Sequence, residues 1–179
     1  SSAAGLNTDN EITTEITGDA NCILFYGVGR GEFYNNFQIK ISAHINPEKA
    51  LLSDINRELI DLYLGIRRNP DVVWDLYSRY PRNKAGYYKI RNLNRDDLHL
   101  LERAARILYL NRTCFKGMWR HNNNGEFNVG YGGQERRWVI GPDDLYAVAQ
   151  RLQHAVLLCC DFEETIASCR EGDFLYLDP

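Results

Sequence analysis

Three short apolar runs in the sequence lead into an aspartate, and this repeated pattern constrains the fold more than any other feature. The runs are ALLSD, AVLLCCD and FLYLD, which end at Asp54, Asp161 and Asp178. Near-continuous apolar strands are typical of a parallel sheet covered by helices on both faces. Helical patterns at about 143–154 and at EETIASCREG separate the last two runs from what precedes them. We therefore predict an α/β fold built on a parallel sheet.

The three aspartates are expected to lie close to one another. The carboxyl ends of parallel strands share one edge of the sheet, and ligands of open α/β sheets bind along that edge. Asp54, Asp161 and Asp178 would then form a polar site. Any one of them taken alone could instead cap a helix or a loop, and for Asp54 this alternative is equally strong.

The segment NCILFYGVGRGEF predicts a strand that runs into a glycine-rich turn, with Gly27, Gly29 and Gly31 at alternate positions. Asp54 follows Gly31 by 23 residues. A strand, a glycine-rich turn and a later acid are typical of sites for adenosine-containing cofactors, in which the acid binds ribose hydroxyls. The glycine spacing differs from that of nicotinamide dinucleotide sites, and the sequence has no Gly-Lys-Ser/Thr of a P-loop.

Helices are predicted over most of the middle of the chain. RELIDLYLGIRRNP has apolar residues at helical spacing and ends before Pro70. From Asp71 to Leu110 the pattern is helical, with turns expected at Pro81 and Gly86. One apolar stripe is clear and consists of Leu98, Leu101, Ala105 and Leu108.

These patterns predict three parts of the chain. Residues 1–20 lack periodicity and are expected to form an irregular N-terminal arm. Residues 21–70 and 140–179 carry the predicted strands and form the α/β core. Residues 71–139 form a mainly helical insertion that ends in a basic loop or hairpin.

Positive charge is concentrated in this insertion. Between Arg79 and Arg120 there are eleven Lys or Arg and three acids, a local charge of +8, whereas the whole chain carries −3 and its remainder therefore −11. Such asymmetry indicates a polyanionic partner on one side of the molecule. The alternative is a solvated surface whose charges pair locally.

The stretch NRTCFKGMWRHNNNGEFNVGYG, residues 111–132, combines cations with large apolar side chains. No helix or strand period organises them, so the segment is predicted to be a loop rather than one face of a core. The residues concerned are Arg112, Phe115, Lys116, Met118, Trp119 and Arg120.

The remaining composition excludes several classes of protein. The 44% apolar and 25% charged content is ordinary for a globular domain, and no apolar run is long enough to span a membrane. The polar start does not resemble a signal peptide. Five cysteines without a CxxC pair predict reduced, mostly buried thiols in a cytosolic protein, and four isolated histidines argue against a metal site.

Taken in order, the segments FYGVG, LLSDIN, LYLNRTCFKGMWRHNNNGEFNVGYG, CDF and LYLDP resemble the Dam-type DNA adenine methyltransferases. This resemblance implies a Rossmann-like S-adenosylmethionine-dependent methyltransferase sheet with an inserted, mainly helical DNA-recognition subdomain. It also implies methyl transfer from S-adenosyl-L-methionine to the exocyclic amino group of a flipped adenine in double-stranded DNA. A cognate restriction endonuclease as partner and the cytoplasm of a bacterial or phage-infected cell fit the same resemblance, and no metal or membrane is implied.

Carried over residue by residue, the resemblance assigns roles to three groups of residues. The cofactor would contact Phe25, Gly27, Gly29, Asp54, Asp161 and Phe162. Asp178 and Pro179 match the start of the catalytic Asp-Pro-Pro-Tyr. DNA would be bound by Arg112, Phe115, Lys116, Met118 and Arg120, with Phe115 filling the gap of the flipped base and Arg120 reading a base edge, whereas Trp119 is expected to be a buried anchor.

The sequence departs from the family pattern at several places. Ile23-Leu24 replaces the acidic-Pro dipeptide before the glycine-rich turn, Lys116 replaces Asn, and Gly130 replaces Pro. The sequence stops at Asp178-Pro179, before the second Pro and the aromatic residue of the motif and before the strands that would complete the sheet. We therefore expect the 179-residue chain alone to have little or no methyltransferase activity. An inactive relative that acts only as a DNA-binding module, and methylation of RNA, are the alternatives.

Overall fold

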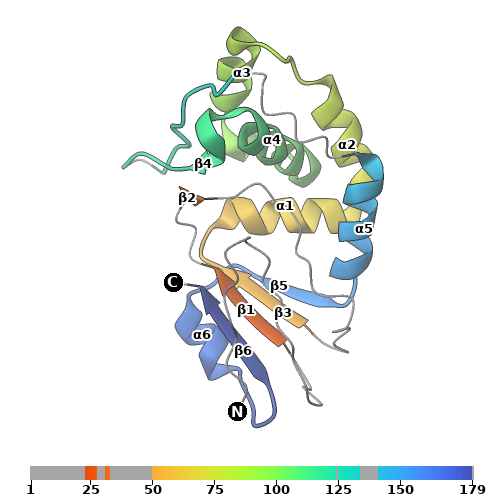
Figure 1. The fold of residues 1–179 in the computed structure, drawn as a ribbon, viewed down its shortest axis with the longest axis vertical. Coiled ribbons are helices and arrows are strands. Elements are labelled where there is room, and N and C mark those ends of the chain that lie inside the picture. The colour runs from red at the N-terminus through yellow and green to blue at the C-terminus, as the bar shows by residue number, and fades with distance from the viewer. Residues whose placement is uncertain (1–22, 28–30, 33–49, 124, 134–140, 179) are drawn as a thin grey trace.

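A small parallel sheet forms the base of the molecule, as the apolar runs predict. The computed structural model describes residues 23–27, 31–32, 50–123, 125–133 and 141–178. The sheet has the strand order β5-β3-β1-β6, and every neighbouring pair is parallel (Figure 1). Its strands are β1 (Ile23–Gly27), β3 (Ala50–Asp54), β5 (Ala155–Leu158) and β6 (Phe174–Asp178). The predicted arm at 1–20 and Gly29 lie outside the described residues.

Helices make up most of the remaining described chain. They are α1 (Arg57–Arg68), α2 (Pro70–Arg79), α3 (Lys84–Arg91), α4 (Leu100–Thr113), α5 (Pro142–Leu152) and α6 (Phe162–Ala167), with short 3-10 turns at η1 (Arg95–Asp97) and η2 (Phe115–Gly117). A second, two-stranded sheet pairs β2 (Gly31–Glu32) with β4 (Met118–Trp119) in antiparallel orientation. The protein is therefore a mixed α/β structure with a small parallel sheet, which confirms the coarse prediction.

Asparagine side chains begin the first three helices. Asn56 accepts hydrogen bonds from the backbone N–H groups of Glu58 and Leu59, and Asn69 and Asn83 cap α2 and α3 in the same way. Such bonds satisfy backbone donors that have no partner within the helix. Pro70, expected only to end α1, also occupies the first position of α2, where its fixed φ and missing N–H are tolerated.

The turn predicted at Gly86 is wrong. Gly86 lies inside α3 and is buried against the Pro81 ring, so that a side chain at this position would collide with Pro81. The glycine therefore serves close packing between the α2–α3 connection and α3, whereas Pro81 does lie in that connection. Leu98 of the predicted stripe precedes α4, and the buried part of the stripe begins inside the helix.

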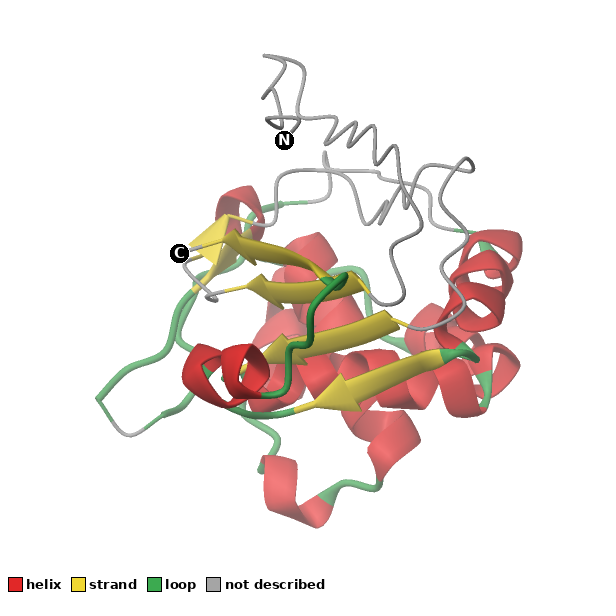
Figure 2. Cartoon of the chain, turned by 90° about the horizontal axis from the view of Figure 1, so that it is seen from below, coloured by secondary structure: helices red, strands yellow, loops and turns green. Residues whose placement is uncertain are grey.

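Helices cover both faces of the sheet. Ala50, Leu52 and Ala155 face a cluster that includes Leu152 of α5 and Tyr63 of α1. Ser53 alternates with Leu52 and therefore points to the opposite face, where its hydroxyl is 2.6 Å from that of Thr165 in α6. Figure 2 shows α6 on one side of the strands and the larger group of helices on the other.

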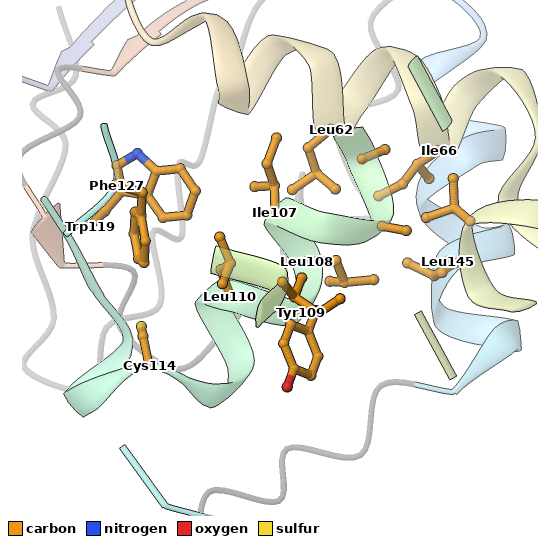
Figure 3. Close-up of a cluster of buried hydrophobic side chains, with 14 of the residues drawn as sticks. Leu62, Ile66, Ile107, Leu108, Tyr109, Leu110, Cys114, Trp119, Phe127 and Leu145 are labelled. Carbon is orange, nitrogen blue, oxygen red and sulfur yellow. The ribbon is translucent and has the colours of Figure 1, made fainter. Parts of the chain in front are cut away.

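The main hydrophobic core lies above α1 rather than within the sheet layer. It joins α1, α2, α4 and α5 through residues such as Leu62, Ile66, Leu108 and Leu145, and extends to Trp119 and Phe127 (Figure 3). Helices of the predicted core thus share one cluster with helices of the predicted 71–139 insertion. The division into core and insertion stays a prediction.

Gly65 sets the closest approach of α1 and α4. A Cβ added at Gly65 would collide with the Cβ of Ala104, which is fully buried. We predict that Gly65→Ala lowers the free energy of unfolding by about 1–3 kcal/mol through overpacking, although alanine is about 1 kcal/mol better in an isolated helix. Urea denaturation would measure this change. The double variant Gly65→Ala/Ala104→Gly should regain part of the loss, and additive effects of the two substitutions would contradict the proposed collision.

Candidate functional site

Two of the three aspartates flank the same residue at the carboxyl edge of the sheet. Gly27, the last residue of β1, is in register with Asp54 of β3 on one side and with Asp178 of β6 on the other. Asp161 follows the end of β5 by three residues and caps α6 by accepting a 3.1 Å hydrogen bond from the backbone N–H of Glu163. Asp54 and Asp178 thus end β3 and β6, which β1 separates, and Asp161 follows β5, the other neighbour of β3. All three lie on the carboxyl side of the sheet, where α/β sheets bind ligands.

Asp54 is a buried acid at this edge. The residue is only 4% exposed, and its Oδ1 accepts a 2.6 Å hydrogen bond from the backbone N–H of Asn56. Burial raises the pKa of Asp54 from 3.8 to about 6, although the Asn56 hydrogen bond acts in the opposite direction. Burial, together with the negative charge of Asp54, also raises the pKa of Tyr63. A desolvated carboxylate held in this way is a strong hydrogen-bond acceptor for a neutral hydroxyl group.

A buried hydroxyl pair joins the strand that carries Asp54 to the helix that follows Asp161. Ser53 and Thr165 are both buried, and their side-chain oxygens are 2.6 Å apart. Phe162, predicted to contact the cofactor, is exposed on α6. Sequence reasoning missed the Ser53–Thr165 pair, for which a serine inside an otherwise apolar strand was the available signal.

The cysteines differ from the prediction. The four described cysteines are free, but only Cys114 is buried; Cys159 is exposed, and Cys160 and Cys169 are partly exposed. The cause is that β5 ends at Leu158, so the two adjacent cysteines lie at the sheet edge rather than inside a strand. Cys22 lies outside the described residues.

The segment from Cys114 to Gly133, which we call the hairpin, folds back on itself after α4. Its two arms are joined by backbone hydrogen bonds, among them Phe115 N–H to Gly130 O at 2.7 Å and Asn128 N–H to Arg120 O at 3.0 Å. Isolated bridges pair Cys114 with Tyr131 and His121 with Phe127. The arrangement is irregular because the bridges alternate with turns, which explains why no period appears in the sequence.

One set of hairpin side chains is buried. Trp119 is 4% exposed and packs against the Phe127 ring, with ring centroids 4.8 Å apart. Figure 3 shows both rings and Cys114 beside Leu110 of α4. The expectation that Trp119 is a buried anchor is confirmed.

A second set points to solvent. Phe115 is 47% exposed, an unusual place for a phenyl ring, and Lys116 and Arg120 are exposed as well. Arg120 Nε donates a 2.9 Å hydrogen bond to the side-chain oxygen of Asn128 on the opposite arm, which orients its guanidinium. Lys116 has a φ of 55°, in the left-handed region that disfavours lysine.

Arg112 and Met118 are less accessible than the other predicted DNA contacts. Both are half-buried, and Arg112 belongs to the last turn of α4. Burial lowers the pKa of Arg112, against the opposing effects of Tyr77 and Asp144. Its electrostatic neighbours therefore lie on α2 and α5. A DNA contact for these two residues stays a prediction.

Part of the positive charge between Arg79 and Arg120 is paired with acidic side chains, three of the pairs with buried acids and one at the surface. Arg95 and Arg103 pair with the buried Asp61 at 2.9 and 3.0 Å, Arg106 pairs with Glu58 at 3.1 Å, and Arg79 pairs with Asp75. These pairs agree with the alternative of locally paired charges, and the polyanionic partner stays a prediction. Exposed cations nevertheless remain, among them Lys84, Lys89, Lys116 and Arg120.

Comparison with known proteins identifies the family of this chain. Residues 24–179 match the profile of the D12 class N6 adenine-specific DNA methyltransferase family. The chain belongs to this family. The family implies a Rossmann-like methyltransferase fold and the use of S-adenosylmethionine, in agreement with the small parallel sheet.

Individual relatives are similar to this chain over most of its length. A type II methyltransferase of Lactococcus lactis subsp. cremoris is 32% identical over 141 residues, which are 74% of this chain and 50% of the relative. The DNA adenine methylase of Haemophilus influenzae is 32% identical over 176 residues, 95% of this chain and 58% of the relative. The DNA adenine methylase of Serratia marcescens is 30% identical over 163 residues, 89% and 57% respectively. The chain thus spans about half the length of the relatives it matches.

Two further features concern membranes and metals. Among the described helices, none combines the length and apolar character that a membrane crossing needs. Within the described ranges, no three His, Cys, Asp or Glu side chains are grouped so that they could hold a metal ion.

The raised pKa of Asp54 predicts a pH-dependent stability. Because its folded-state pKa of about 6 exceeds the 3.8 of the free side chain, the folded protein binds more protons between these values, and its stability falls as the pH rises through this window. We predict that Asp54→Asn, which retains an acceptor for the Asn56 N–H, raises the free energy of unfolding by about 1–2 kcal/mol at pH 8 and by much less at pH 4.

Denaturant unfolding at the two pH values would measure this difference. Glu171→Gln, at an exposed position before β6, is the matched control and should change stability by no more than about 0.5 kcal/mol at either pH. A destabilising effect of Asp54→Asn at pH 8 would contradict the prediction.

Proposed function

We propose that this protein is a site-specific DNA adenine methyltransferase that methylates the exocyclic amino group of an adenine flipped out of double-stranded DNA. The observation that carries the proposal is the register of Asp54 and Asp178 on either side of Gly27, at the sheet edge where this family's fold would bind its cofactor. In detail, the fold would be a Rossmann-like methyltransferase sheet, with residues 71–139 as the DNA-recognition insertion.

The residues at the edge fit S-adenosylmethionine. The buried Asp54 carboxylate would accept hydrogen bonds from the ribose hydroxyls, and Asp161 with the exposed Phe162 ring would hold the adenine. Phe25, Gly27 and Gly29 complete the proposed pocket. When bound, S-adenosylmethionine supplies a methyl group on a positively charged sulfur.

The resemblance gives Asp178 and Pro179 the task of aligning the target base. The Asp178 carboxylate and a nearby backbone carbonyl would accept hydrogen bonds from the amino group, which holds the nitrogen lone pair in line with the methyl carbon. The bound donor would supply the methyl group and keep the electron pair of its C–S bond, and the proton that the methylated amino group gives up would pass to water, while Asp178 would hold that amino group in place. The protein thus contributes alignment and a polar clamp.

The exposed side of the hairpin fits duplex DNA. Phe115 would fill the space of the displaced adenine, and Arg120, oriented by Asn128, would read a base edge. Lys116 would bind a phosphate. A cognate restriction endonuclease is a further proposed partner, supported by a relative that is named a type II methyltransferase. A DNA substrate would place the protein in the cytoplasm of a bacterial or phage-infected cell.

The second candidate is a DNA-binding module that has lost the donor site. The observation that favours it is Ile23-Leu24 in place of the family's acidic-Pro dipeptide. Titration calorimetry with S-adenosylmethionine separates the two candidates. Binding supports the methyltransferase, whereas no binding together with intact affinity for duplex DNA supports the module.

Asp54→Asn is predicted to weaken cofactor binding although it stabilises the fold. Loss of a charge-assisted hydrogen bond to a ribose hydroxyl should raise the Kd for S-adenosylmethionine by about 10- to 100-fold in calorimetry. Glu171→Gln again serves as the control. An unchanged Kd for Asp54→Asn would remove Asp54 from the proposed site.

Lys116→Asn is predicted to stabilise the protein and weaken its DNA binding. Asparagine adopts the left-handed conformation more readily than lysine, so the free energy of unfolding should rise by about 0.5–1 kcal/mol. Loss of one phosphate contact should reduce the slope of log Kd against log salt concentration by about one, as measured by fluorescence anisotropy with a random-sequence duplex.

The matched control for Lys116→Asn is Arg68→Gln. Arg68 is an exposed cation in the last turn of α1, at the opposite end of this helix from the hairpin. Its loss should leave the salt dependence unchanged. Equal slopes for Lys116→Asn and the wild-type protein would contradict a phosphate contact at Lys116.

A further inference from the structure

A buried carboxylate connects the hairpin to the helix that follows Asp54. Glu58 lies in the first turn of α1, is buried, and accepts hydrogen bonds from two directions. Arg106 of α4 donates from Nη1 at 3.1 Å, and Nε2 of His121 in the hairpin lies 3.0 Å from the other carboxylate oxygen. A single side chain of α1 thus contacts both the insertion helix and the hairpin.

Arg106 brings a third element to the same point. Its Nε and Nη2 donate to the carbonyl oxygens of Ile90 and Arg91 at 3.2 and 2.7 Å, at the C-terminal end of α3. The two bonds tie Arg106 to the end of α3, where the last carbonyl groups lack the usual donor four residues further along a helix. The guanidinium is therefore held in place independently of the hairpin, whereas the Glu58–His121 contact reaches the hairpin.

The hydrogen between Glu58 and His121 belongs to the histidine. Burial alone would raise the pKa of Glu58, but the His121 hydrogen bond and the charge of Arg106 outweigh burial and hold this pKa below its usual value. An ionised carboxylate can only accept, so Nε2 of His121 carries the hydrogen and donates it. The imidazole ring also packs edge-on against Trp119 and Phe127, with centroids 5.7 and 5.9 Å away.

Glu58 is also connected to the candidate cofactor edge. The Asn56 N–H donates to Asp54 at 2.6 Å, and the Glu58 N–H donates to the Asn56 side chain at 3.0 Å. Three successive hydrogen bonds thus lead from Asp54 to His121. A buried ion pair contributes little net stability compared with apolar packing, but its directionality can fix one arrangement of the elements that it joins.

We propose that Glu58 and His121 are positioning residues that hold the hairpin in a fixed orientation relative to the Asp54 edge. The inference rests on the proposed function, because it assigns to this contact the placement of Phe115 and Arg120 against DNA. Neither residue of the pair touches DNA or cofactor in this scheme. The pair acts through the hairpin backbone, one residue from Arg120.

The test compares three variants of the protein. His121→Leu removes the donor and keeps an apolar side chain against Trp119. His121→Gln restores an N–H donor of similar reach. Arg95→Gln removes a cation from the other buried acid of α1, Asp61, and is the matched control because the Arg95 guanidinium pairs with α1 in place of the hairpin.

The measured quantities are the Kd for a random-sequence duplex by anisotropy, its salt dependence, the Kd for S-adenosylmethionine and the thermal midpoint. His121→Leu should raise the DNA Kd about 10-fold, the effect expected for one charge-assisted hydrogen bond, with an unchanged salt slope because no phosphate contact is lost. The S-adenosylmethionine Kd should stay within about 2-fold. His121→Gln should recover most of the DNA affinity, and Arg95→Gln should resemble the wild-type protein.

The outcomes separate the inference from the proposed function. If the wild-type protein binds both ligands and His121→Leu binds DNA equally well, or if His121→Gln fails to recover affinity, the positioning role is wrong and the proposed function stands. If the wild-type protein does not bind duplex DNA, both are wrong. If His121→Leu lowers the thermal midpoint by more than about 5 °C, His121→Asn replaces it, because its shorter amide cannot span the distance to Glu58.

Discussion

The arrangement of this protein depends on two carboxylates buried on one face of α1. Glu58 and Asp61 are one helical turn apart, and Arg106 and Arg103, one turn apart on α4, pair with them. A buried acid that loses its cation lowers the stability of the fold by several kcal/mol. Separating α1 from α4 would therefore be unfavourable, because it would leave these acids without their arginine partners. Gly65 brings the two helices into close contact one turn further along α1. The polar pairs therefore determine which helix packs on α1 and in which register.

The opposite side of α1 packs on the sheet, so the pairing of α1 with α4 also fixes the position of α4 relative to the sheet. Tyr63 packs against Ala50 and Leu52 of β3, while Asn56 and Asp54 fix the start of the helix at the end of the same strand. One helix thus holds both the sheet edge and the helices that precede the hairpin. The distance between a ligand at Asp54 and a group bound at Phe115 is set by rigid elements rather than by a linker.

Local sequence patterns predicted the strands of the parallel sheet and the first helix, but not the contacts between distant elements. The parallel strands and α1 follow from apolar runs and caps that span a few residues. The edge formed by Asp54 and Asp178 follows from topology, once the strands are known to be parallel. The Glu58–His121 contact joins residues 63 positions apart, and an isolated histidine in the sequence gives no sign of its partner. Which charges of the basic segment are paired is not visible within it for the same reason, because the acids that pair with Arg95, Arg103 and Arg106 lie on α1, outside residues 79–120.

Two features that lower the stability of the fold bear on the choice between a methyltransferase and a DNA-binding module. Lys116 occupies a backbone conformation that lysine disfavours, and Asp54 keeps a carboxylate out of water at the sheet edge. Departures from local preference concentrate at functional sites, since elsewhere they only reduce stability. The unfavourable backbone conformation of Lys116 is compatible with either function, because both proposals use the hairpin to bind DNA. The buried carboxylate of Asp54 would serve no purpose in a module that only binds DNA, since an asparagine could accept the same Asn56 hydrogen bond without the buried charge. The retained carboxylate therefore favours a protein that still binds its methyl donor.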